Sequence, residues 1–154
     1  MRIAVDGRHL LAGRGVARAT RSLLAQLAGE LPGAEIVAVV PGRAPVADRP
    51  RGVRLARVPL PSRAVHGAAV VAGRPRVDRL AGGADVVWLP APAPVAVSRR
   101  VPVVLTVHDR SWELRPSDFT AYERAWHRMA RPRALARRAA RVVTASAWVR
   151  DDLA

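Results

Sequence analysis

Short, valine-rich apolar runs recur along this chain, and each is bounded by glycine, proline or charged residues. They cover residues 3–5, 35–40, 53–58, 84–89, 101–107 and 141–145. Most of these runs are continuously apolar and do not alternate with polar residues, which is typical of strands buried on both faces of a parallel sheet. The sequence therefore predicts an α/β fold with helices on both sides of the sheet.

Helical patterns alternate with the predicted strands. The expected helices cover residues 16–31, 63–72, 133–140 and a last segment that begins at residue 147. Pro32-Gly33 is a stop signal for the first helix, and Ser146 is a good N-cap for the last. The alternation predicts one domain over residues 1–154, built on an open, doubly wound, mostly parallel sheet.

A further helix is expected after Pro116, with Ser117 as its N-cap and Pro132 at its end. Its large apolar residues fall at helical spacing and are Phe119, Tyr122, Trp126 and Met129. Burial against a core requires this spacing, so we interpret the stripe as core packing in preference to a platform for a ligand.

The first predicted strand leads into a glycine-bearing turn, Gly13 to Arg18, which opens the first helix. Glycines at 13 and 15 would let the backbone approach a ligand closely, and the helix N-terminus offers unpaired N–H groups to an anion. This pattern favours a nucleotide or sugar phosphate near Gly13, Gly15 and Arg18. The alternatives are a loop that only connects two elements and an Arg18 that is simply solvated.

Ligands of doubly wound sheets bind beyond the C-terminal ends of the strands. His108 and Asp109 directly follow the run 101–107, so both side chains should emerge at that edge, near the glycine turn. An imidazole there can bond a sugar hydroxyl, and the carboxylate can act as a base or hold the turn. The loop of alternating prolines over residues 90–97 should be extended and line the same cleft.

Asp6, Arg8 and His9 lie beyond the first strand at the same predicted edge. The arginine could pair with a phosphate, and the aspartate could bond ligand hydroxyls or backbone groups. Alternatively, Asp6 and Arg8 pair with each other. These three residues are candidates for the acceptor side of a site.

The formal net charge of +14 looks at first like a nucleic-acid signal. Every basic residue is an arginine, while alanine, valine and proline abound, which indicates codon bias as part of the cause. The arginines are spread over the whole length without interleaved stacking aromatics. Nucleic acid is therefore a less favoured partner than an anionic membrane surface.

The chain has no cysteine, which excludes disulfides and thiolate metal sites and fits a reducing cytoplasm. His66 and His127 have no neighbours at metal-ligand spacing, so no metal site is expected. The opening residues do not form a signal segment, and prolines interrupt the apolar stretches. We expect a cytoplasmic protein, either soluble or peripheral on the inner face of a membrane.

Three segments together resemble the N-terminal domain of a retaining glycosyltransferase of family 4, which has two-domain GT-B architecture. They are the first strand with its glycine turn, the run Pro102 to Asp109 that ends in His-Asp, and the stretch from Tyr122 through Arg138 to Ser146. Ala17 and Ala19 depart from the family's loop, in which a second glycine and an aromatic are usual.

The resemblance implies transfer of a sugar from a nucleotide-sugar donor to a glycan, lipid-linked or other acceptor, without a metal or other cofactor. It implies that Gly13 and Gly15 approach the donor diphosphate and that His108 contacts the donor sugar. Arg18 remains a further candidate for phosphate binding, and Asp109 a further candidate for catalysis. The Rossmann-like N-terminal half of these enzymes shapes the acceptor pocket, and an arginine-rich face suits an anionic acceptor.

By this resemblance, residue 154 lies before the last strand of the family's first domain. It also lies before the second domain, which binds the donor. We therefore expect an incomplete sheet with exposed apolar surface at its end, and a chain that is inactive alone and completed by a second chain or domain. The alternative is a non-catalytic, arginine-rich module that binds an anionic lipid, glycan or nucleic acid. A lone flavodoxin-like nucleotide-binding protein is a weaker alternative.

Overall fold

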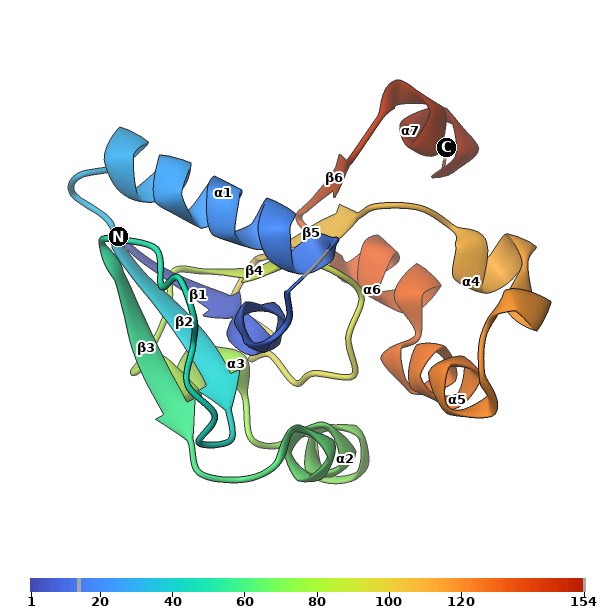
Figure 1. Cartoon of the computed structure of the whole chain (residues 1–154), viewed down its shortest axis with the longest axis horizontal. Helices are drawn as coiled ribbons and strands as arrows, with labels where there is room; N and C mark the ends of the chain where they lie inside the picture. Colours follow the sequence, from blue (N-terminus) through green and yellow to red (C-terminus); the bar gives the residue numbers. More distant parts are fainter. Residues whose placement is uncertain (14, 154) are drawn as a thin grey trace.

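The computed structural model describes residues 1–13 and 15–153, and over them the chain forms one parallel sheet with helices on both faces (Figure 1). Its six strands lie in the order β3-β2-β1-β4-β5-β6. Their bounds are β1 Arg2–Asp6, β2 Glu35–Pro41, β3 Val53–Val58, β4 Val86–Leu89, β5 Val103–Val107 and β6 Arg141–Thr144. The predicted parallel, doubly wound α/β sheet is confirmed.

The chain between the strands is mostly helical. The 3₁₀ turns are η1 Gly7–Leu11 and η2 Pro116–Asp118. The α-helices are α1 Val16–Glu30, α2 Ser62–Ala72, α3 Val77–Leu80, α4 Ser111–Leu114, α5 Ala121–Ala130, α6 Pro132–Arg138 and α7 Ala147–Leu153. No helix in the described part of the chain is long and apolar enough to cross a membrane.

The core divides into two layers because successive strand residues point to opposite faces of the sheet. Ile3 and Val5 join the layer that Leu24 of α1 covers, whereas Ala4 joins the layer covered by α3, α6 and α7. Strand β1 is buried in both layers and pairs with β2 on one side and β4 on the other. The strand order therefore reverses at β1, and ligands of such sheets bind beyond the C-terminal ends of the strands at this point.

Most predicted boundaries hold to within two residues, with a few informative differences. β5 begins at Val103, two residues later than predicted, because Pro102 has no N–H to donate to the ladder. Ser146 caps α7 as predicted, since its Oγ accepts a hydrogen bond from Val149 N at 3.3 Å. Strands β1, β2, β4 and β5 are largely buried, whereas the edge strand β3 is buried only at Val53 and Val58. The other edge strand, β6, exposes Val142 and Val143, in agreement with the expected apolar surface at this end.

The prediction for the helix after Pro116 is wrong in two respects. Ser117 lies in η2, and α5 begins instead at Ala121 behind Thr120, which forms a capping box with Glu123. The stripe on α5 is not core either, because Tyr122 is 51% exposed and Met129 40%.

The periodicity identified an apolar face of α5 correctly but could not show what that face meets. Figure 1 places α5 at the side of the sheet near α2 and α6, not over the strands. Trp126 is partly buried against Arg8 and His66, which belong to the C-terminal edge of the sheet.

Gly7 directly follows Asp6. Because it has no Cβ, it allows η1 to lie close to β2. A Cβ at this position would lie 2.9 Å from the Val39 carbonyl oxygen and 2.9 Å from Val40 Cγ2. We predict that Gly7→Ala lowers the free energy of unfolding by about 1–3 kcal/mol, because backbone must move to relieve the contact.

The matched control is Gly29→Ala in α1, where the added Cβ meets nothing within 4 Å. This change should raise stability by about 0.5–1 kcal/mol through helix propensity. Urea unfolding of both variants measures the difference, and equal stability of the two would contradict the close approach at Gly7.

Candidate functional site

The carboxylate of Asp6 is buried at the end of the central strand and organises the turn that follows. Its Oδ1 accepts a hydrogen bond from Arg8 N at 3.3 Å, which caps η1. Its Oδ2 lies 3.3 Å from Arg8 Nε, close enough for an ion pair with a side chain that is itself only 11% exposed. Of the two interpretations from sequence, the mutual pairing of Asp6 and Arg8 is present in the structure.

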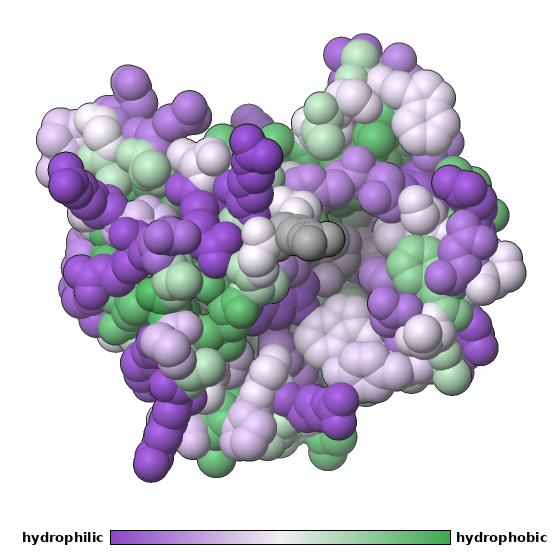
Figure 2. All heavy atoms as spheres, viewed as in Figure 1, coloured by the Kyte–Doolittle hydropathy of each residue, from purple (hydrophilic) through white to green (hydrophobic). Residues whose placement is uncertain are grey.

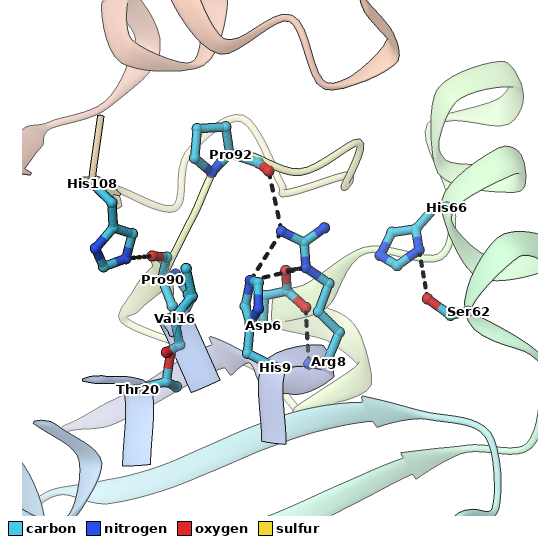
Figure 3. Close-up of polar contacts among 10 residues, drawn as sticks. All are labelled: Asp6, Arg8, His9, Val16, Thr20, Ser62, His66, Pro90, Pro92 and His108. Atoms are coloured by element: carbon cyan, nitrogen blue, oxygen red, sulfur yellow. Dashed lines mark hydrogen bonds and ion pairs between the residues drawn. The ribbon is translucent and has the colours of Figure 1, made fainter. Parts of the chain in front are cut away.

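The Arg8 guanidinium joins three parts of the chain (Figure 3). Its Nη2 donates to the Pro92 carbonyl at 3.1 Å, in the proline loop after β4. Its Nε donates to His9 Nε2 at 3.2 Å, and its Cζ lies 4.8 Å from the centre of the Trp126 ring. One cation thus joins the end of β1, the proline loop and α5.

His66 and Trp126 belong to this cluster, and the sequence analysis assigned neither of them to a site. The His66 ring meets the edge of Trp126 at 4.8 Å between centroids, and its Nδ1 lies 3.0 Å from Ser62 Oγ. His66 is 3% exposed although it lies in a helix of mostly small residues. A buried polar side chain on a helix can indicate a functional site, but the sequence alone does not show that His66 is buried.

Both histidines beside Arg8 are held in the neutral form. Burial, with the positive charge of Arg8 added, lowers the pKa of His9 from 6.5 to about 4. Burial also lowers the pKa of His66. Because His9 Nε2 accepts a hydrogen bond from Arg8, its proton must sit on Nδ1.

His108 emerges at the end of β5, as predicted, and contacts the neighbouring loop. Its Nε2 lies 2.9 Å from the Pro90 carbonyl oxygen. A carbonyl can only accept, so His108 Nε2 donates this hydrogen bond and Nδ1 is left for another partner. Figure 3 shows His108 on the same edge of the sheet as His9 and Arg8, and the proline loop lies between them.

Asp109 is exposed, and its Oδ1 accepts a hydrogen bond from Ser111 N at 2.8 Å. This is the turn-holding arrangement that the sequence offered as one of two alternatives. The structure brings His108 toward the cluster around Arg8 but turns one oxygen of Asp109 toward its own loop.

The glycine turn lies open in front of α1. A Cβ at Gly13 or Gly15 would meet nothing within 4 Å, and Gly15 has φ 57°, a left-handed value that favours glycine. Among the described residues no side chain caps the first turn of α1. Arg18 N donates to the Gly15 carbonyl at 3.0 Å, and the N–H groups of Val16 and Ala17 remain available to an anion. Arg18 is exposed on that turn, and Arg14 lies outside the described residues.

Arg21 supports this turn, and sequence reasoning did not single it out. Its Nη2 donates to the carbonyls of Leu10 and Ala12 at 3.1 Å and 2.6 Å. These bonds tie the end of η1 to α1 and fix the path of the chain that leads to Gly13. Figure 2 shows this face of the molecule hollowed between the α1 side and the side of α4 and α5.

The cluster keeps unused hydrogen-bonding capacity. Among the described residues, Asp6 Oδ2 and Arg8 Nη1 are buried without a hydrogen-bond partner. Buried groups of this kind are costly, and such atoms concentrate where a ligand or water completes the site. In the described part of the chain, no three His, Asp or Glu side chains are grouped as they would be around a metal ion.

Titration of His9 predicts a loss of stability at acidic pH. Unfolded His9 binds a proton below about pH 6.5 and folded His9 only below about 4, so the unfolded state takes up more protons between these values. The free energy of unfolding should therefore fall as pH drops from 6.5 to 4, by about 2–3 kcal/mol from this group.

Urea unfolding at pH 7.5 and pH 5 measures this loss in the wild type and in His9→Gln, whose amide oxygen can still accept from Arg8. The variant should lose clearly less stability between the two pH values. An equal loss in both proteins would remove His9 as the cause.

Comparison with known protein families shows which family the chain belongs to. The model of a family described as Glycosyltransferase Family 4 matches residues 13–154, from the glycine turn to the end of the chain. No curated protein and no solved structure matches the chain. Asp6, Arg8 and His9 precede the matched segment, so their place in the site rests on geometry alone. The match covers strands β2 to β6, the open glycine turn and His108, and the chain belongs to glycosyltransferase family 4.

Proposed function

We propose that this chain is the acceptor-side domain of a retaining glycosyltransferase that moves a sugar from a nucleotide-sugar donor to a glycan, lipid-linked or other acceptor. Family membership supports a glycosyltransferase-type function and does not favour the non-catalytic binding module. The observation that carries the proposal is the meeting of the glycine turn, His108 and the Arg8 cluster at one edge of the sheet.

The donor diphosphate is proposed to lie against Gly13, Gly15 and the first turn of α1. The uncapped N–H groups and the positive end of a 15-residue helix stabilise phosphate charge there. Arg18, exposed on the same turn, adds a cation that can move toward the ligand. These groups neutralise a diphosphate without a metal, and the nucleotide sugar is the only co-substrate that the proposal needs.

His108 is proposed to orient the donor sugar. With Nε2 committed to Pro90, its free Nδ1 accepts a hydrogen bond from a sugar hydroxyl and holds the ring relative to the acceptor. Asp109 stands beside it, exposed, as the carboxylate that can take a proton from the acceptor hydroxyl.

Asp6, Arg8 and His9 are proposed to form the acceptor side. Arg8 Nη1 and Asp6 Oδ2 have no hydrogen-bond partner among the described residues, although Oδ2 faces Arg8 Nε. Nη1 can therefore donate to a hydroxyl or anionic group, and Oδ2 can accept from a hydroxyl, directly or through water. The nucleotide of the donor is then bound by a second α/β domain, on a further segment or chain. Under this proposal the described edge is half of a site, and the isolated chain does not turn over.

Protein NMR with UDP-glucose and GDP-mannose tests the donor half of this proposal. Millimolar ligand should shift the amides of Gly13, Gly15, Val16 and Ala17 and the His108 ring, and leave Gly29 at the far end of α1 unchanged. His108→Ala should weaken binding about tenfold by removing one hydrogen bond to the sugar, while the α1 amides still respond.

Two outcomes would contradict the proposal. Shifts spread evenly over the arginine-rich surface would show charge attraction without a site. Sugar transfer by the isolated chain, measured as released nucleoside diphosphate with an acceptor panel, would contradict the half-site.

A further inference from the structure

The segment 111–130, which contains α4, η2 and α5, stands apart from the hydrophobic core. In Figure 1, α4 and α5 lie away from the strands, at the side of the molecule opposite to β3. None of the described residues 111–129 is buried. In the described structure neither core layer includes a side chain from residues 108–134, although Val107 and Leu135 on either side pack into one of them. Contacts other than the burial of apolar surface therefore hold this segment in place.

A small aromatic cluster joins the parts of the segment to each other. The rings of Trp112 and His127 are stacked with 6.2 Å between their centroids, and Phe119 makes an edge contact with His127 at 5.3 Å. Trp112 lies on α4, Phe119 follows η2 and His127 lies on α5. The three elements thus form one unit, which we call the flap (residues 111–130).

Grooves separate the flap from the helices around it. One, of about 550 Å³, opens between α4, α5 and α6, and another, of about 290 Å³, separates α4 from α6 and α7. A third, of about 330 Å³, lies between α2, the proline loop and the junction of α5 with α6. Trp112 Nε1 and His127 Nδ1 are buried at the first groove without a hydrogen-bond partner among the described residues. Elements packed as loosely as this open locally at a low cost in free energy.

The connections at both ends of the flap can act as hinges. At its C-terminal end Arg131 joins α5 to α6 with φ 48° and ψ 59°, a left-handed conformation that costs an arginine more than a glycine. At its N-terminal end, residues 108–110 lie outside helices and strands. The ion pair of Glu113 with Arg133 of α6 contributes little to docking, because the arginine side chain is 64% exposed. A rotation at the two connections would move the flap as a body and leave β5 and α6 in place.

Two aromatic side chains of α5 dock the flap on the rest of the molecule. The Arg8 guanidinium lies over the Trp126 ring, with 4.8 Å from Cζ to the ring centre, and Trp126 also makes an edge contact with His66 at 4.8 Å. One turn earlier, Arg63 of α2 lies over the Tyr122 ring at 5.0 Å. Residues four apart lie on one face of a helix, so this face of α5 is the docking face.

Docking of the flap is coupled to the position of Arg8. The guanidinium that stacks on Trp126 also pairs with Asp6 and donates to the Pro92 carbonyl and to His9. If Trp126 moves away, one face of this guanidinium becomes open to water, which weakens its attraction to the carboxylate at the end of β1. The flap thus controls how firmly the cluster around Arg8 is held.

We propose that the flap is a movable element that docks on Arg8 through Trp126, and that it undocks as a unit while the sheet stays folded. A ligand that bonds Arg8 Nη1 in the docked arrangement stabilises that arrangement, because a ligand shifts an equilibrium toward the state it binds better. The docking itself rests on the contacts described above, whereas its effect on acceptor binding rests on the proposed function.

Amide hydrogen exchange of the whole chain, followed by NMR without any ligand, tests this proposal. In the wild type, the amides of α5 from Trp126 to Ala130 should exchange about a hundredfold faster, or more, than those of β1 and β4. The reason is that undocking of the flap frees α5 to open, whereas the strands exchange only when the core unfolds.

Arg63→Ala tests the docking from outside the flap. It removes the partner of Tyr122 and changes neither α5 nor Arg8, so the α5 amides should exchange about threefold faster. The Arg8 Nε–H proton, which is bonded to His9, should exchange faster by a similar factor because undocking uncovers Arg8. Arg51→Ala removes an arginine from an exposed position between β2 and β3 and should change neither rate.

Trp126→Ala removes the main docking contact, and the α5 amides should then exchange about tenfold faster or more. Alanine has a higher helix propensity than tryptophan, so fraying of α5 alone would make the exchange slower instead. Trp148→Ala is the matched control on α7, where the side chain is 65% exposed, and it should leave the exchange of α5 unchanged.

Three results would overturn the proposal. Protection of α5 equal to that of β4 would show that the flap unfolds only with the core. Unchanged exchange of α5 in Trp126→Ala would remove docking through this side chain. Faster exchange of α5 in Arg63→Ala with an unchanged rate for Arg8 Nε–H would separate the flap from Arg8. Since no nucleotide sugar is present, failure of the donor titration would overturn the proposed function alone and leave this inference standing.

Discussion

A carboxylate buried at the end of the central strand constrains everything around it. Asp6 is 4% exposed, and an isolated charge there would be very costly, so the chain turns back to supply the Arg8 guanidinium. The resulting pair is weak evidence for stability, since its desolvation offsets its attraction. Its consequence is geometric, because the guanidinium that pairs with Asp6 also contacts Pro92, His9 and Trp126. One ion pair thereby sets the position of the proline loop and of α5.

The strand order explains why these groups can meet. After β3 the chain returns across the sheet and enters β4 on the free side of β1, so the ends of β1, β4 and β5 are neighbours although they are far apart in sequence. Pro90 and Pro92 follow β4, and their carbonyls accept from His108 and Arg8. Proline residues suit this segment because it offers carbonyls to side chains while its own nitrogens need no partner.

Sequence reasoning predicted the sheet well because that information is local. A continuous apolar run such as 36–40 indicates that both faces of a strand are buried, and nearby glycine or proline residues mark where the strand ends. The cluster around Arg8 was only half predicted. Its predicted members lie at the ends of strands or just after them and are Asp6, Arg8, His9 and His108. His66 and Trp126 were missed because they lie on helices whose packing partners are distant in sequence. The same limit led to the wrong interpretation of α5, because amphipathic spacing does not distinguish a core from a crevice.

The arginine excess separates, in the structure, into two populations that composition alone mixes. One population is structural. Arg21 and Arg138 donate to backbone carbonyls at turns. Arg8 and Arg110 form ion pairs with buried or partly buried carboxylates. In this role arginine contributes directed donors, and at Arg8 and Arg110 also a compensating charge. The other population lines a groove that α5 and α6 form with α4. There Arg133 shares Glu113 with Arg110 and Arg124 donates to the Phe119 carbonyl, whereas Arg128, Arg131 and Arg137 bond neither a carboxylate nor a carbonyl of the described residues. Like charges repel each other, so a concave cluster of such cations raises the free energy of the folded chain. A bound anion would offset this repulsion.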